Sequence, residues 1–238
     1  MIRGHRFTWW VIVATSLALL SGPGTVAGAD THRSWGLYLG LNVAKMGGDM
    51  DQLGDDLAQL MESEFGGEWS SSIGTRMGPM GGAYHHWPLS RTFGLQVEGM
   101  WVRRGTKLTF TTAGLTADTD FKVSYLELPL LARWSPASDG KMRFFLVAGP
   151  VVGFKTSADM VVTVDEESET VNAGAVFQST VFSLVGGIGL EAEVGDRTSV
   201  HLQARYQRGL TDGLNNPDYS SGLEDFSILG GLSFAISP

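Results

Sequence analysis

The chain has 238 residues, a formal net charge of −8 and no cysteine. An acidic chain is repelled by phosphate backbones, so no nucleic-acid partner is expected. Without disulfides, an exported chain of this size must be stabilised by packing and hydrogen bonding, as closed β-sheets are.

The first 29 residues have the pattern of a cleaved signal peptide. Arg3 and Arg6 precede a short apolar run that ends at Leu20, and an A-x-A cleavage site ends at Ala29. The run is shorter than a membrane-spanning helix requires, and no other apolar stretch approaches that length. The sequence therefore predicts export, with residues 30–238 as a single mature domain.

Apolar residues alternate with other residues in eight segments, a period of two that predicts β-strands. Several segments are longer than the usual strand of a soluble domain and match the ~9–11 tilted residues that cross a bilayer. Glycines within them suit a strongly curved sheet. The segments are roughly 34–46, 74–87, 92–104, 121–134, 142–155, 177–194, 198–210 and 225–236.

The connections between these segments alternate in length. Short turns follow the second, fourth and sixth segments, so the long and short connections lie at opposite ends of a closed sheet. The sequence predicts an all-β fold, an eight-stranded antiparallel up-and-down transmembrane β-barrel. Long acidic loops are expected near residues 47–73, 105–120, 156–176 and 211–224.

The first long loop contains a helical pattern. Residues 51–65 place Leu53, Leu57, Leu60 and Met61 at helical spacing. This spacing predicts a short amphipathic helix that lies over the barrel mouth.

The sixth and seventh strands determine the register of their turn. A two-residue turn at 195–196 would set the apolar face of one strand against the polar face of the other. A three-residue turn at 195–197 instead pairs Glu191 with His201, and both faces then agree. We therefore expect the three-residue turn.

The barrel architecture predicts two sets of residues, a polar interior and an aromatic belt. Ionisable groups at membrane depth are costly unless they pair, and eight strands leave an interior just wide enough for side chains, so the polar faces should form a hydrogen-bonded plug. Aromatic residues near strand ends predict a belt at the membrane interface, formed by Trp87, Trp101, Trp134, Phe154 and Tyr206. The interior set is Gln96, Glu98, Arg104, Glu127, Arg133, Glu191, His201, Gln203, Arg205 and Gln207.

Alternation alone does not say which face meets lipid. A lipocalin-like exported barrel, apolar inside and polar outside, is the rival architecture and would bind a ligand. Long strands, and charges segregated into the loops, favour lipid outside. In the fourth segment Leu126, Leu128 and Leu130 share one face, whereas Glu127 and Arg133 lie opposite.

Two stretches, YLELPLL at residues 125–131 and FLVAGPVVGF at residues 145–154, resemble paired strands of the PorT-type outer-membrane β-barrel proteins. The likeness extends to residues 40–42, 95–98 and 205–206. The resemblance implies an eight-stranded barrel in the outer membrane of a diderm bacterium. Most of the family has no assigned activity, and the secretion role of its named member does not carry over to this chain.

The sequence predicts no enzyme, metal or cofactor. Glu191 beside His201 would suit an orienter and a base, but no serine is well placed as the nucleophile. His85 and His86 face opposite sides of a strand and do not form a metal pair. Acidic residues at the start of the first loop follow the calcium-binding EF-hand pattern only until Leu53.

The sequence favours a structural or interaction role, with outer-membrane lipid and an envelope or external protein, reached through the acidic loops, as partners. The alternatives are a lipid-modifying hydrolase, a narrow small-solute channel and, for a soluble barrel, a lipocalin-like binder. The acidic loops are interpreted as solvated, with weak bridging of divalent cations near lipopolysaccharide as the alternative. The oligomeric state stays open.

Overall fold

The computed structural model describes residues 33–46, 50–112, 115–136, 141–164, 167–215 and 221–236. The predicted signal peptide lies outside the described residues. The described part contains a helix, α2 (Met50–Phe65), and the strands β1 (Ser34–Met46), β2 (Ser70–Pro88), β3 (Phe93–Thr112), β4 (Leu115–Trp134), β5 (Met142–Val164), β6 (Glu167–Asn172), β7 (Thr180–Glu193), β8 (Thr198–Asp212) and β9 (Gly222–Ala235).

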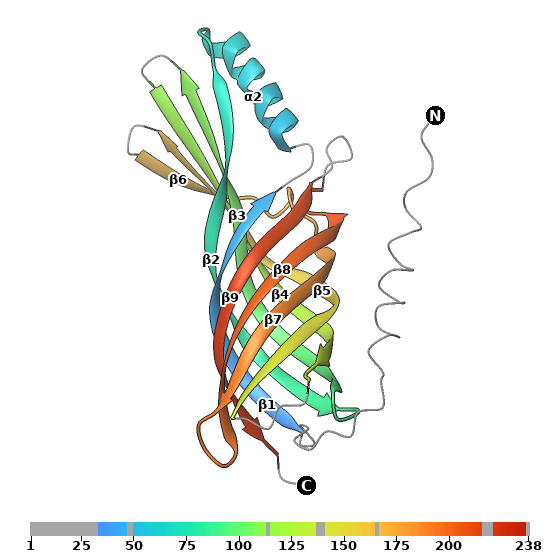
Figure 1. Ribbon diagram of the computed structural model, residues 1–238. Coiled ribbons are helices and arrows are strands. Elements are labelled where there is room, and N and C mark those ends of the chain that lie inside the picture. Colours follow the sequence, from blue (N-terminus) through green and yellow to red (C-terminus); the bar gives the residue numbers. More distant parts are fainter. Residues whose placement is uncertain are drawn as a thin grey trace, which may run out of the picture.

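Eight of these strands close into an antiparallel ring. The order around it is β1-β2-β3-β4-β5-β7-β8-β9, and β9 pairs back onto β1. The ninth strand, β6, pairs with the last residues of β5 (Figure 1). The predicted eight-stranded up-and-down barrel is thereby confirmed. No helix in the described part of the chain is both long and apolar enough to cross a membrane.

The apolar face of the strands points away from the interior of the ring. Leu39 is 77% exposed, and Leu128 and Ile188 are 45% and 49% exposed. Charged residues of the same strands are buried, such as Glu127 in β4 at 0%. A soluble barrel would have these faces exchanged, whereas an apolar outer wall suits lipid.

The tight turn between β7 and β8 has the three-residue register expected from the sequence. Glu191 pairs with His201 across the two strands. The backbone amides of Val194 and Gly195 both donate to the carbonyl oxygen of Thr198, which closes the turn.

Strands, not loops, continue above the barrel, which corrects the expectation for residues 105–120 and 156–176. β3 pairs with β4 as far as Thr112, and β5 turns back into β6. Threonines and acidic residues alternate here with apolar ones, and β-branched residues favour strands. We call this upper sheet the platform; it consists of residues 70–75, 105–112, 115–124, 156–164 and 167–172.

The helix α2 forms where the amphipathic pattern predicts it, but it packs on the platform instead of covering the barrel mouth. Ala58 is buried with Leu108, Phe110 and Ala117 of β3 and β4 in one apolar cluster. An apolar helix face is buried against the nearest apolar surface, and here the platform supplies it. Figure 1 shows α2 beside the upper ends of β2 and β3. Leu60, predicted on the apolar face, is 60% exposed.

The segment between β6 and β7 closes the upper end of the lumen. Phe177 is 2% exposed and packs with Tyr125 and Leu214, which are also buried. The Nζ of Lys155 donates to the carbonyl oxygens of Gly174 and Phe177 and holds this segment in place. Phe177, and not the helix expected from the sequence, therefore covers the mouth of the barrel.

Gly189 makes room for an aromatic ring in the lumen. A Cβ atom at Gly189 would lie 2.2 Å from Cζ of Phe145, whose side chain is buried. We expect Gly189→Val to lower the free energy of unfolding by about 1–3 kcal/mol because the ring must move. Urea unfolding in detergent micelles would measure this loss. Gly186→Val in the same strand is the control, since a Cβ there meets nothing within 4 Å, and equal losses at both positions would contradict the expectation.

Candidate functional site

The ten polar residues assigned to the lumen all lie inside the ring, and none is more than 7% exposed. They gather around three arginines. Arg133 lies one residue from the end of β4, beside the short turns, and Arg104 lies toward the platform. Arg205 of β8 lies between them. Each arginine is held by at least one buried carboxylate.

The upper group surrounds Arg104. Its Nε contacts Asp225, its Nη1 contacts Glu127, and its Nη2 donates to the second oxygen of Glu127 at 3.1 Å. The amide of Gln207 also donates to Glu127, at 3.2 Å. One cation thus faces two carboxylates in a site closed to water.

The middle group is a bidentate pair. The Nη1 and Nη2 of Arg205 each lie 2.7 Å from one oxygen of Glu98. The hydroxyl of Tyr38 and the amide of Gln96 donate to the same carboxylate, both at 2.6 Å. Glu98 therefore accepts four hydrogen bonds, which compensates its burial. The Nη2 of Arg205 also donates to Gln203 at 2.9 Å.

The lower group joins Arg133 to Glu191. The Nη2 of Arg133 contacts one oxygen of Glu191, and the hydroxyl of Ser233 donates to the other at 2.9 Å. The Nη1 of Arg133 lies 3.4 Å from Oε1 of Gln96, which links this group to the middle one. The ring of His201 packs edge-on against Tyr84, with 5.5 Å between the ring centroids.

The five residues of the predicted belt lie on the outer wall of the barrel. Trp101, Phe154 and Tyr206 are 39%, 42% and 49% exposed. Trp87 and Trp134 are half-buried beside the short turns, and Trp134 packs edge-on against Phe144. Trp101 lies in the middle of β3, because that strand continues into the platform.

A family model described as "Outer membrane protein beta-barrel domain" matches residues 28–215. The chain belongs to this family. This outer-membrane β-barrel protein therefore lies in a bacterial outer membrane, where its apolar wall faces lipid and its charged residues face the lumen.

Three solved structures are similar to this outer-membrane barrel. OprG from Pseudomonas aeruginosa has 10% sequence identity and a TM-score of 0.48, over 89% of this chain and 99% of that one. Neisserial surface protein A has 12% identity and a TM-score of 0.48, over 88% and 100%. Ail of Yersinia pestis has 13% identity and a TM-score of 0.39, over 86% and 100%. No curated protein sequence matches the chain significantly.

Three residues that hydrogen-bond to the buried ion pairs are absent from the set that the sequence predicts: Tyr38, Asp225 and Ser233. Each has the inward parity of its strand, opposite apolar residues such as Leu37 and Phe226, which are 51% and 49% exposed. The alternation of apolar and polar residues in β1 and β9 therefore indicates that these three side chains face the lumen. Asp225 was obscured because it lies beside an expected acidic loop.

The barrel lumen does not arrange these groups as a hydrolase does. Glu191 is occupied by Arg133 and Ser233, and Nδ1 of His201 has no hydrogen-bond partner in the described part of the chain. A nucleophile needs a base within hydrogen-bond reach. Among the described residues there is also no group of three potential metal ligands.

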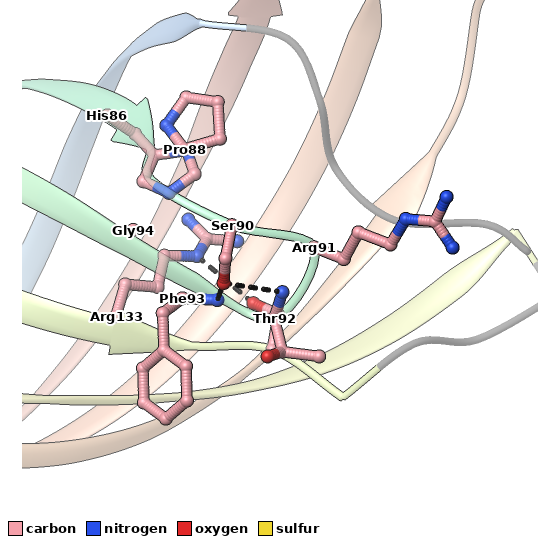
Figure 2. A pocket seen from close by; sticks show the side chains of 9 residues that line it. His86, Pro88, Ser90, Arg91, Thr92, Phe93, Gly94 and Arg133 are labelled. Carbon is pink, nitrogen blue, oxygen red and sulfur yellow. Dashed lines mark hydrogen bonds between the residues drawn. The ribbon is translucent and has the colours of Figure 1, made fainter. Parts of the chain in front are cut away.

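One small pocket opens at the short-turn end of the barrel (Figure 2). The hydroxyl oxygen of Ser90 accepts hydrogen bonds from the backbone amides of Thr92 and Phe93 at 3.3 and 3.0 Å. The pocket holds about 10 Å³, room for about one water molecule and not for a substrate. It is lined by His86, Pro88, Ser90, Arg91, Thr92, Phe93, Gly94, Arg133 and Ser135.

Proposed function

We propose that the protein is a closed, non-conducting outer-membrane barrel whose platform presents an interaction surface to an envelope or external protein. The platform is the observation that carries this proposal. Its strands continue the barrel wall beyond the aromatic belt, and α2 buries an apolar cluster on one face. The chain thus holds a large surface in a fixed shape outside the membrane, which suits recognition of a partner.

The lumen supports the closed state. Three arginine-centred groups fill it along its length, and Phe177 covers its upper end. Eight strands leave room for little more than these side chains. The barrel therefore acts as an anchor for the platform.

The helix α2 and the β6 edge of the platform carry exposed acidic residues. Glu62 and Glu64 of α2 and Glu169 of β6 are exposed. Such a surface favours a partner with a positively charged face, since complementary charge speeds association and selects partners. We also propose that the protein is a PorT-type member of the family and that a cleaved signal peptide exports it. Both proposals rest on the sequence features described above.

We expect the purified protein to give no single-channel current steps in planar bilayers, because the ion pairs leave no continuous water path. The measurement uses unboiled, folded protein, and a reconstituted porin serves as the positive control. Current steps that change in size with Arg205→Ala or Glu127→Ala would establish the small-solute channel instead.

A photo-crosslinking residue placed at Thr170 in β6 should form a discrete protein adduct in intact cells. Thr170 is exposed on the platform. The control position is Leu89, which is 73% exposed at the opposite end of the barrel. A crosslinking residue at Glu62 of α2, which is also exposed, should form the same adduct, and that adduct should disappear when residues 156–172 are replaced by a short turn. If no exposed platform position gives an adduct that Leu89 lacks, the interaction role is wrong.

A further inference from the structure

Four cationic side chains lie on the outer wall just above the aromatic belt. Arg103 follows Trp101 by two residues in β3, and its guanidinium carbon is 5.5 Å from the centroid of that indole ring. Lys122 of β4 is paired with Gly105, on the same face. We call Arg76, Arg103, Lys107 and Lys122 the cationic group.

Arg76 joins this group through two local features of the chain. The register between β2 and β3 is irregular after Thr75, which brings the Arg76 side chain to the outer face. There it crosses Gly105, where a Cβ would lie 2.7 Å from Cδ of Arg76. The Nη1 of Arg76 lies 2.7 Å from Asp120. A glycine and a strand irregularity together bring a fourth cation to this face.

The cationic group keeps a net positive charge. Asp120 pairs with Arg76, and Asp118 pairs with Lys107 at 2.8 Å. The hydrogen bond from Lys107 lowers the pKa of Asp118, so this pair stays ionised in mildly acidic medium. Within the described residues, Arg103 and Lys122 form no ion pair with a carboxylate, although Asp159 of β5 is the cross-strand neighbour of Lys122. Three carboxylates therefore face four cations, and the group keeps one net positive charge.

The same arrangement recurs on β8. Arg208 follows Tyr206 of the belt by two residues, is exposed, and lies 3.5 Å from Glu224. Lys45 of β1 is paired with Glu224 from the other side. On β5, by contrast, the residue two positions after Phe154 is Thr156. The cations therefore lie on β8, β1, β2, β3 and β4, whereas β5 contributes the carboxylate of Asp159.

We propose that the cationic group binds the phosphate groups of anionic lipid head groups in the outer leaflet. Its position, where the lipid-facing apolar wall meets the base of the water-exposed platform, is where head groups lie. Guanidinium and ammonium groups are the side chains that pair with phosphate, and arginine does so with two parallel hydrogen bonds. Lipid is favoured over free phosphate because Leu126 and Trp101, directly below, are exposed to acyl chains.

The test measures lipid binding to full-length protein in a neutral detergent by native mass spectrometry. The probes are lipid A carrying two phosphates, the same lipid with its phosphates removed, and inorganic phosphate. We expect the phosphorylated lipid to bind at least tenfold more tightly than either of the others. The double variant R103Q/K122Q should lose about tenfold or more of this affinity, since each cation near an anionic surface contributes separately.

The matched control is K141Q/R197Q, which removes two exposed cations at the short-turn end. It should bind the phosphorylated lipid as the unchanged protein does. K107Q/K122Q is a second variant if R103Q/K122Q does not fold, and folding is checked by the mobility shift on boiling. Equal losses in the variant and the control, no loss in either, or equally tight binding of inorganic phosphate would each overturn the proposal.

Discussion

Replacing Glu98 with alanine is expected to lower the free energy of unfolding by about 3–5 kcal/mol, because it leaves a buried cation without its partner. Arg205 would remain 3% exposed in the lumen, and Tyr38 would lose the acceptor of its hydrogen bond. The measurement is a urea titration in detergent micelles, with the folded fraction read from unboiled gels. The double variant Glu98→Ala/Arg205→Met should recover part of the loss, since no charge is then left unpaired.

Glu169→Ala is the matched control for this prediction. Glu169 is exposed on the platform, and exposed substitutions of this kind change stability by about 0.5 kcal/mol or less. If Glu98→Ala cost no more than this control, water would have to enter the lumen and solvate Arg205. That outcome would favour the channel alternative over a closed plug.

Leu130→Arg is expected to destabilise the protein by about 2–4 kcal/mol in lipid vesicles, the cost of a cation near the centre of a bilayer. Leu130 is 47% exposed on the outer wall, four residues from Trp134 and four from Leu126, which pairs with Trp101. The two tryptophans mark the two interfaces, so Leu130 lies midway between them. Unfolding in urea, followed by tryptophan fluorescence, would measure the loss.

Thr116→Arg in the same strand tests whether depth in the membrane is the cause. Thr116 is exposed in the platform, where water solvates an added guanidinium, so we expect a change near zero. The difference in unfolding free energy between the two variants should shrink in a short-chain detergent, because the arginine side chain can extend past its thinner apolar layer into water. Similar small effects at both positions in vesicles would mean that the outer wall faces water.

The barrel itself could be predicted from the sequence because each strand carries its own signal. One face of β1 reads Leu37, Leu39, Leu41, and the same period repeats in every wall strand. Parity also determined the β7–β8 turn, since only one register keeps both faces consistent. These inferences need no knowledge of contacts between distant strands.

The platform could not be recognised in the same way. Residues 105–120 also alternate, but threonine and aspartate occupy the outer positions, a composition shared by loops and by strands in water. Only the cross-strand pairing of Lys107 with Asp120 and of Thr109 with Asp118 shows that these residues form strands and not a loop. The place of α2 depends on that sheet, so it could not be predicted either.

The lumen residues followed from parity, but their partners did not. Arg104 and Asp225 are 121 positions apart and meet only when the ring closes. The cationic group could not be predicted either. The register irregularity after Thr75 changes which residues of β2 face outward, so simple alternation assigns Arg76 to the wrong face. Local periodicity gives the face of a side chain, whereas closure of the sheet gives its neighbour.

Among the described residues, β6 leaves one edge of the upper sheet without a neighbouring strand. Barrels crowd together in an outer membrane, and an open edge is where adjacent molecules can join their sheets into a continuous ribbon. Glu169 stands exposed on this edge, and two copies meeting there would bring like charges together. Charge repulsion at this edge would therefore oppose the lateral joining of two copies, whereas a molecule of opposite charge would meet no such repulsion.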